Sequence, residues 1–284
     1  MILIADSGST KTTWCLMAKS GKASYFRTDG LNPFFVREDE IESIINTQLL
    51  PEIAKHLWIG PIEQIWFYGA GCTPEKCPQV ADALARVFKK AKIEVLSDMY
   101  GAARALLGHT PGVACILGTG SNSCLFDGEK FTKSVPALGF ILGDEGSGAV
   151  LGKRLVADIL KNQLGEELKQ LFCLEMNVTQ ADIIEHVYRQ PMPNRYLASL
   201  SRFCANHIDM PAIKHLVYEH FQTFVDRNIK QYPANMPVGF VGSIAYFYRP
   251  ILEQVLAENR IVIANILQEP IEGLKTYHAI STEI

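Results

Sequence analysis

Two short turns rich in Gly, Ser and Thr carry the residues of this chain that best suit phosphate chemistry. The first, Gly8–Thr10, lies in the run ILIADSGSTKTTWCLM, and the second, Gly118–Gly120, lies in ACILGTGSNSCLF. Each turn separates two apolar runs, which predicts a β-hairpin. Backbone N–H groups and hydroxyls that converge in such a turn form a concavity suited to phosphate oxygens. For either turn alone, ordinary hairpin chemistry is the better explanation, so the interest lies in the pair.

A carboxylate, Asp6, stands directly before the first turn. It would repel a phosphate, unless a Mg²⁺ ion held directly or through water lies between them. The first turn is not a Walker A loop, because Lys11 follows Thr10 rather than a glycine. No GxGxxG sequence opens a helix after the first strand, which disfavours a dinucleotide cofactor.

A third glycine element is GFVGSIA at 239–245, a buried strand that ends in Gly242 and Ser243 before a helix. Small residues there would let a flat ligand lie against the backbone, and the start of the helix would favour an anion. An ordinary strand–helix turn with Ser243 as N-cap explains the same pattern about equally well.

The elements that must position these turns follow one plan twice. The first half has apolar strand patterns at 1–5, 12–18, 24–28, 63–68 and 92–97, with helical spacing at 38–50, 78–91 and 99–108. The second half has strand patterns at 112–118, 123–127, 238–242 and 260–266, and helical patterns from Ser147 to about Gln231 and at 243–259. This order predicts an α/β protein of two domains, 1–110 and 111–284, with a final helix at 273–284 expected to pack on the first domain.

Composition excludes several classes of function. The 284 residues carry a net charge of −3, which gives no basic surface for nucleic acid or anionic lipid. No apolar stretch reaches the ~18–20 residues that span a bilayer, and MILIAD lacks the basic start of a signal peptide. The seven cysteines are scattered without a CxxC pair, which is typical of reduced thiols in a cytoplasmic protein.

The order of these three glycine elements resembles the nucleotide-binding signature of the sugar kinase, actin and heat-shock chaperone ATPase superfamily. Four further motifs narrow the resemblance: TDGLNPF with Asn32, EVLSDMYGAARAL with Asp98 just after a strand, GTGSN, and LGDEGS with Asp144. Together they look like the N-acetylglucosamine kinase branch of the BadF/BadG/BcrA/BcrD ATPase family. That resemblance implies a duplicated ribonuclease H-like (actin-like ATPase) fold whose two domains hold ATP in a central cleft, from opposite sides.

The resemblance also implies a role for each motif residue. Asp6 would hold Mg²⁺ through water, and Asp98 would be the catalytic base that accepts the proton of the attacking sugar hydroxyl. The residues implied for ATP are Gly8, Ser9, Thr10, Lys11, Gly118, Thr119, Gly120, Gly242 and Ser243, and those implied for the sugar are Asn32, Asp98, Ser121, Asn122, Leu138, Gly139 and Asp144. Helix caps and turns would also explain Asp98, Asp144 and Asn32 taken singly.

The implied reaction is Mg²⁺-assisted in-line transfer of phosphate from ATP to an N-acetylated hexosamine. The first candidate sugar is N-acetyl-D-glucosamine, which would be converted to its 6-phosphate. Ala137-Leu138-Gly139 stands where the family's amino-sugar kinases commonly carry Gly-Trp-Gly, which leaves N-acetylmuramate, N-acetylmannosamine and glucosamine open. Two alternatives of other classes are an ATPase that activates a 2-hydroxyacyl-CoA dehydratase and a non-catalytic sugar sensor. The expected partners are ATP and the sugar, without nucleic acid or membrane, and a homodimer is left open.

Overall fold

The computed structural model describes residues 1–56 and 60–280, and it contains two five-stranded sheets built to one plan. The chain forms two compact units. Unit 1 comprises Met1–His109 and Glu269–Ile284, and unit 2 comprises Thr110–Gln268. No helix in the described part of the chain is long and apolar enough to cross a bilayer.

The sheet of unit 1 has the strand order β3-β2-β1-β4-β5. Its strands are β1 (Ile2–Ser7), β2 (Lys11–Met17), β3 (Ala23–Asp29), β4 (Gln64–Gly69) and β5 (Lys92–Ser97). The first three strands run antiparallel, whereas β4 and β5 run parallel to β1. The predicted first hairpin is confirmed, and Asp6 lies opposite Thr13 in its register.

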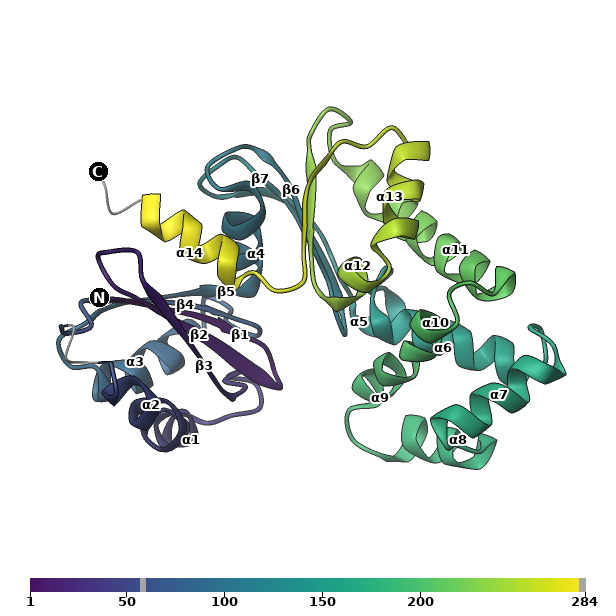
Figure 1. The fold of residues 1–284 in the computed structure, drawn as a ribbon, viewed down its shortest axis with the longest axis horizontal. Coiled ribbons are helices and arrows are strands. Elements are labelled where there is room, and N and C mark those ends of the chain that lie inside the picture. The colour runs from purple at the N-terminus through teal and green to yellow at the C-terminus, as the bar shows by residue number, and fades with distance from the viewer. Residues whose placement is uncertain (57–59, 281–284) are drawn as a thin grey trace. The chain divides into compact units, whose positions relative to one another are not determined.

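Helices cover both faces of this sheet (Figure 1). They are α1 (Glu38–Ile44), the π-helix Ile45–Leu49, α2 (Leu50–Ala54), α3 (Cys77–Val87), α4 (Asp98–Leu107) and α14 (Ile271–Ile280). One face of the sheet buries Leu3 and Trp14 with α1 and α3, and the other buries Ile4 and Tyr68 with α14, as the alternation of side chains along a strand requires. Residues 281–284 of the expected final helix lie outside the described part of the chain.

The sheet of unit 2 repeats the plan with the order β10-β9-β6-β7-β8. Its strands are β6 (Gly112–Leu117), β7 (Ser121–Phe126), β8 (Phe131–Val135), β9 (Val238–Val241) and β10 (Ile263–Leu267). Again three antiparallel strands are followed by two parallel ones. The predicted second hairpin is therefore confirmed as β6–β7. The β8 strand has no clear sequence pattern because most of its side chains are exposed.

The remaining helices belong to unit 2. They are α5 (Gly139–Leu142), α6 (Gly148–Leu160), α7 (Glu166–Met176), α8 (Gln180–Arg189), α9 (Pro193–Leu200), α10 (Arg202–Asn206), α11 (Pro211–Arg227), the 3-10 helix Ile229–Gln231, α12 (Ser243–Phe247) and α13 (Arg249–Glu258). The prediction of one continuous helix over 243–259 is wrong. The helix is interrupted at Tyr248, because Pro250 has no N–H to donate and is tolerated only in the first turn of a new helix, α13.

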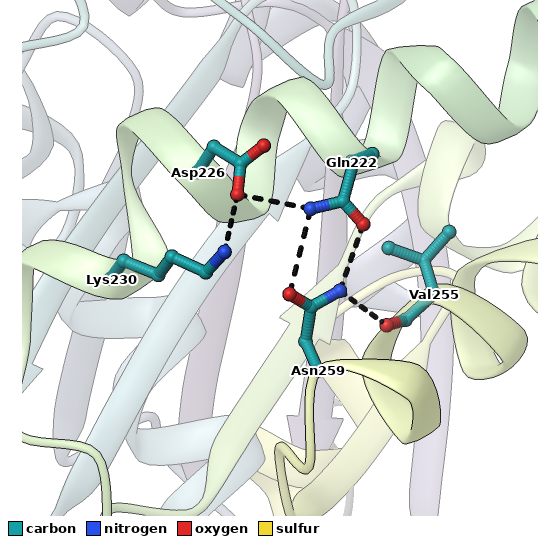
Figure 2. Close-up of polar contacts among 5 residues, drawn as sticks. All are labelled: Gln222, Asp226, Lys230, Val255 and Asn259. Atoms are coloured by element: carbon teal, nitrogen blue, oxygen red, sulfur yellow. Dashed lines mark hydrogen bonds and ion pairs between the residues drawn. The ribbon is translucent and has the colours of Figure 1, made fainter.

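A polar network fixes α11 against the end of α13 (Figure 2). The Asn259 amide nitrogen donates to Gln222 Oε1 at 2.8 Å and to the Val255 carbonyl at 2.9 Å. Gln222 in turn donates to Asp226 at 3.0 Å, and Asp226 also pairs with Lys230. The same helices bury Phe221, Phe224 and Leu252 in the core of unit 2, so the layer behind β9 and β6 is rigidly built.

Candidate active site

The first phosphate turn is held in shape by the strands on either side of it. The Gly8 N–H donates to the Lys11 carbonyl at 2.9 Å, which closes the turn. Below it, the hydroxyls of Ser7 and Thr12 are 2.8 Å apart. The chain returns across the turn at Gly30, where a Cβ atom would lie less than 3.0 Å from the backbone of Ser9. Glycine is therefore required for this close approach.

Asn32 lies beside this turn and is only 6% exposed. Its Nδ2 donates to Ser9 Oγ at 2.7 Å, and its Oδ1 accepts from the Phe34 N–H at 3.0 Å. A Cβ atom on Gly71 would overlap the Asn32 amide, so the opposite wall is also tightly packed. An amide NH₂ group has two donors. The Asn32 amide is therefore suited to a polar contact, in a fixed position, with a ligand beside the first phosphate turn.

Two carboxylates, Asp6 and Asp98, lie at one edge of the sheet of unit 1. Asp6 comes near the end of β1, and Asp98 begins α4 directly after β5. Because β1 and β5 are both parallel to β4, their carboxyl ends meet at the edge where α/β sheets bind ligands. The main-chain N–H groups of Met99 and of Asp98 itself lie close enough to the Asp98 carboxylate to lower its pKa, although burial has the larger, opposite effect. Asp98 is thus the first residue of a helix at the same edge of the sheet as Asp6.

The charge of these carboxylates is poorly compensated by the protein. Burial raises the pKa of Asp6 to about 7, repulsion from Asp98 and Glu269 adds to this, and Lys11 opposes it. Burial also raises the pKa of Asp98. A hard cation favours oxygen ligands of this kind and would relieve the repulsion. The donor set therefore fits Mg²⁺.

The second phosphate turn, in unit 2, packs against the start of α6. Its Gly118 N–H donates to the Gly120 carbonyl at 3.0 Å, and the Gly118 carbonyl accepts from the Gly148 N–H at 2.8 Å. Gly242, just before α12, passes behind this turn with φ +125° and ψ 163°. A Cβ atom there would lie less than 3.0 Å from the Leu117 carbonyl oxygen. The GFVG motif thus brings the start of α12 to the phosphate turn.

Asp144 is attached to the strand that follows the second turn. Burial raises the pKa of its carboxylate, and the main-chain groups of Ser121 and Gly139 oppose this rise. Its backbone has φ +56°, and its N–H donates to the Ala137 carbonyl at 2.8 Å. Next to it, Leu138 is 64% exposed. The LGDEGS motif is therefore a folded polar loop, and the stretch just before and at its start exposes three apolar side chains, Leu138, Ile141 and Leu142.

Asn122 behaves differently from its neighbours. Its Oδ1 accepts from the Ser123 N–H at 2.9 Å, so part of its side chain is engaged locally along β7. In unit 2 the structure brings Ser121 and Gly139 close enough to the Asp144 carboxylate to influence its pKa.

A cavity of about 250 Å³ opens beside the second turn, entirely within unit 2. Its lining combines Gly118 and Thr119 with Ser243 and with residues of helices that the motifs do not cover. The other lining residues are Gly148, Arg195, Ala198, Ser199, Ser201, Arg202, Ala205, Ile244, Phe247 and Tyr248. The second phosphate turn, two aromatic residues and two arginines thus surround one cavity, which suits the nucleoside part of a nucleotide.

The residues missed by sequence reasoning are the arginines of this cavity and Glu269. Arg195 and Arg202 lie in a helical stretch without glycine motifs, and only the fold brings them beside Thr119. Glu269 forms an ion pair with Lys11, 258 residues away in sequence. No local pattern signals such a pairing.

Comparison with known proteins gives the family. No family model matches the chain, and neither does any curated protein. A solved structure from Porphyromonas gingivalis, provisionally named an N-acetylglucosamine kinase, is 47% identical over 99% of this chain and 100% of its own, with a TM-score of 0.94.

Two more distant structures share the fold. A protein of the same provisional name from Chromobacterium violaceum is 16% identical, with a TM-score of 0.73, over 97% of this chain and 98% of its own. A ROK-family glucokinase from Streptomyces griseus, solved with glucose and AMPPNP, is 14% identical, with a TM-score of 0.54, over 99% of this chain and 98% of its own. The two repeated sheets are those of actin-like ATPases. The chain belongs to the N-acetylglucosamine kinase-like branch of the BadF/BadG/BcrA/BcrD ATPase family and is an ATP-dependent sugar kinase.

Proposed function

We propose that this sugar kinase transfers the γ-phosphoryl group of Mg²⁺-ATP to the 6-hydroxyl of an N-acetylated hexosamine, with N-acetyl-D-glucosamine as the first candidate. The observation that carries the choice of sugar is the 47% identity, over 99% of the chain, to the Porphyromonas gingivalis protein of that provisional name. The polar loop around Asp144 and the fixed amide of Asn32 supply the kind of directed hydrogen bonds that recognise sugar hydroxyls.

Asp98 is the catalytic base in this proposal. A carboxylate whose pKa is raised by burial accepts a proton more readily than an exposed aspartate does at neutral pH. Asp98 begins α4 at the carboxyl end of β5, the edge of the sheet where α/β proteins usually bind ligands. Phosphoryl transfer needs positioning and charge neutralisation more than covalent catalysis. One base with a fixed place is therefore sufficient.

Asp6 would hold Mg²⁺ through water, and the metal would neutralise charge on the phosphates. Within residues 1–56 and 60–280, no three His, Cys, Asp or Glu side chains are close enough together to ligate a metal by themselves. Water and ATP would complete the coordination, as is usual for Mg²⁺. Gly8, Ser9, Thr10 and Lys11 would contact the phosphates from unit 1.

Unit 2 would bind the rest of the nucleotide. Gly118, Thr119 and Gly120 would hold phosphate through the backbone of the second turn. The cavity beside them would take the nucleoside, with Gly242 and Ser243 at its wall. For the sugar, Ser121, Asn122, Gly139 and Asp144 would supply contacts from unit 2, and Asn32 from unit 1.

Leu138 supports a second candidate sugar. By the family resemblance set out above, it takes the place of a tryptophan. It is exposed, and it is smaller than an indole. The smaller side chain leaves room for an additional substituent, such as the lactyl ether of N-acetylmuramate. Comparison of the two sugars with wild type and Leu138→Trp tests this idea. We expect the substitution to lower kcat/KM for N-acetylmuramate more than for N-acetylglucosamine.

The proposal as a whole is tested by ADP release from Mg²⁺-ATP with N-acetylglucosamine, N-acetylmannosamine, N-acetylmuramate, glucosamine, glucose or no sugar. Strong stimulation by one N-acetylated sugar is expected. ADP release that no sugar changes would refute the proposal. In that case the iron content of the protein would test the alternative of a dehydratase activator.

A further inference from the structure

We propose that Glu269 is a positioning residue for ATP, because its carboxylate holds the Lys11 ammonium beside the first phosphate turn. This inference rests on the proposed function, in which Lys11 contacts phosphate. Glu269 lies outside every motif that suggested the site. Its role follows from the ion pairs that it forms and from the way the segment that follows it is anchored.

The carboxylate of Glu269 is shared by two cations of unit 1. Its Oε1 accepts from Lys11 Nζ in a direct ion pair, and Arg27 Nη2 lies 3.8 Å from the same oxygen. Lys11 is the first residue of β2, directly after the phosphate turn, and Arg27 lies on the neighbouring β3. The Glu269 side chain is 26% exposed, whereas that of Lys11 is 53% exposed. Glu269 is the more buried partner and therefore fixes the position of the more exposed Lys11.

The segment that follows Glu269 is anchored on unit 1. Glu269 is the first residue of the C-terminal segment that belongs to unit 1, and Pro270 follows it. The Pro270 carbonyl accepts from the Leu274 N–H at 2.9 Å, which starts α14. Leu274 is completely buried, and Gly273 lies so close to Ala105 of α4 that a Cβ atom would overlap its backbone. These contacts anchor to unit 1 the segment that directly follows Glu269.

The ion pair between Glu269 and Lys11 is better explained by a role in phosphate binding than by a contribution to the stability of the fold. An ion pair with a partner half exposed to water adds little to the free energy of unfolding. An unpaired lysine would sample many rotamers, and ordering it on a ligand costs entropy. An ammonium has three donors, so a pairing with Glu269 leaves others for phosphate oxygens. With Arg27 present, the three groups keep a net charge of +1, which still attracts a phosphate.

The test compares Glu269→Gln with wild type in two assays. In the first, KM for Mg²⁺-ATP should rise by about fivefold to twentyfold while kcat changes by less than about threefold, as expected when a ground-state contact is weakened. In the second, the Kd of Mg²⁺-ADP, measured by calorimetry without sugar, should rise if the same lysine contacts the β-phosphate. Glu269→Asp, which keeps the charge, should restore part of the affinity.

Matched variants separate positioning from structure. Glu272→Gln removes a carboxylate three residues after Glu269, in the first turn of α14, which is paired with Lys275 at 2.7 Å. It should leave both constants unchanged. Lys11→Met should weaken nucleotide binding by itself. Because Glu269 acts through Lys11, adding Glu269→Gln to Lys11→Met should have little further effect.

Three results would overturn the inference. They are unchanged or tighter nucleotide binding in Glu269→Gln, a loss equal to that in Glu272→Gln, and an undiminished loss in the Lys11→Met background. A fall in Tm with unchanged nucleotide constants would be the first of these, since it would show a structural role only. The calorimetric assay contains no sugar. Its result therefore stands even where no sugar in the panel is phosphorylated, an outcome that counts only against the proposed function.

Discussion

Gly242→Ala should be one of the most destabilising single-methyl additions in unit 2. Gly242 is the N-cap of α12 with φ +125° and ψ 163°, a backbone region that is essentially restricted to glycine. An added Cβ would also lie less than 3.0 Å from the Leu117 carbonyl oxygen and 3.2 Å from the Gly118 nitrogen, whereas ordinary contact begins at 3.4 Å. Both neighbours are backbone atoms of β6 and the second phosphate turn, so no side-chain rotation relieves the overlap.

The structure supplies a control that separates the cost of backbone strain from the cost of steric overlap. Gly165, the N-cap of α7, has φ +92° and ψ 152°, but a Cβ there would meet nothing within 4 Å. Gly165→Ala therefore carries only the backbone strain, about 1–3 kcal/mol. Gly242→Ala carries similar strain plus the overlap, which adds about 1–3 kcal/mol as overpacking usually does.

The assay is thermal unfolding of both variants beside wild type. One kcal/mol corresponds to roughly 2–4 °C in Tm for a domain of this size, so Gly242→Ala should unfold about 2–12 °C below Gly165→Ala. Because Leu117 and Gly118 must move, Gly242→Ala should also weaken Mg²⁺-ADP binding, while Gly165→Ala should not. Equal Tm values for the two variants, or unchanged nucleotide binding in Gly242→Ala, would refute the reasoning.

Three further predictions concern unit 1. Asp98→Asn should lower kcat by about 10²–10⁴-fold, as loss of a general base does, while the Kd of Mg²⁺-ADP stays within about threefold. The pKa of Asp6 is about 7 in the folded protein, above its ordinary 3.8. Because its ionisation costs stability, wild type loses stability as pH rises from about 4 past 7. In Mg²⁺-free buffer, the Tm of Asp6→Asn should therefore rise relative to that of wild type over that range. Tyr68→Phe should destabilise unit 1 by about 1–3 kcal/mol, because the Tyr68 hydroxyl accepts from Arg104 at 2.7 Å and contacts His278 Nε2 at 2.9 Å.

Each of these predictions has a matched control and a contrary outcome. Asp158→Asn, on the outer part of α6, should leave kcat unchanged, and an Asp98→Asn enzyme with near-normal kcat would remove Asp98 as the base. The pKa of Asp127 is lowered by main-chain hydrogen bonds, so Asp127→Asn should lose stability relative to wild type as pH rises. A Tm difference between Asp6→Asn and wild type that does not change as pH rises from about 4 past 7 would contradict the argument that burial raises the pKa of Asp6. Tyr218→Phe loses only an exposed contact to Glu258; a Tyr68→Phe variant no less stable than this control would show that the buried network contributes nothing.

The two hairpins were predictable because their signals are local. Apolar runs around Gly8–Thr10 and Gly118–Gly120 alternate in the way that half-buried strands require, and both pairings are observed. The break at Tyr248 was not predicted, since the apolar spacing of 243–259 continues through Pro250 and hides the change of helix. The π-helix Ile45–Leu49 likewise keeps its buried residues in helical spacing, so the pattern gives no sign of it.

The candidate site residues likewise divide into those with a local sequence signal and those without one. Asp6 lies near the end of β1 and Asp98 directly follows β5, and strand ends can be located from sequence. Within unit 2, Arg195 and Arg202 come beside Thr119 only through contacts between segments distant in the chain, and within unit 1 Glu269 comes to Lys11 in the same way. Such contacts depend on tertiary packing, which single-sequence patterns do not encode.

The measurement that tests the central claim most directly is ³¹P NMR of the products formed from Mg²⁺-ATP and N-acetylglucosamine, with wild type and Asp98→Asn run in parallel. We expect ADP and a sugar phosphate esterified at the 6-hydroxyl with wild type, in equal amounts, and almost none with Asp98→Asn. Formation of ADP with inorganic phosphate and no sugar phosphate, for this sugar and for N-acetylmuramate, would contradict the account.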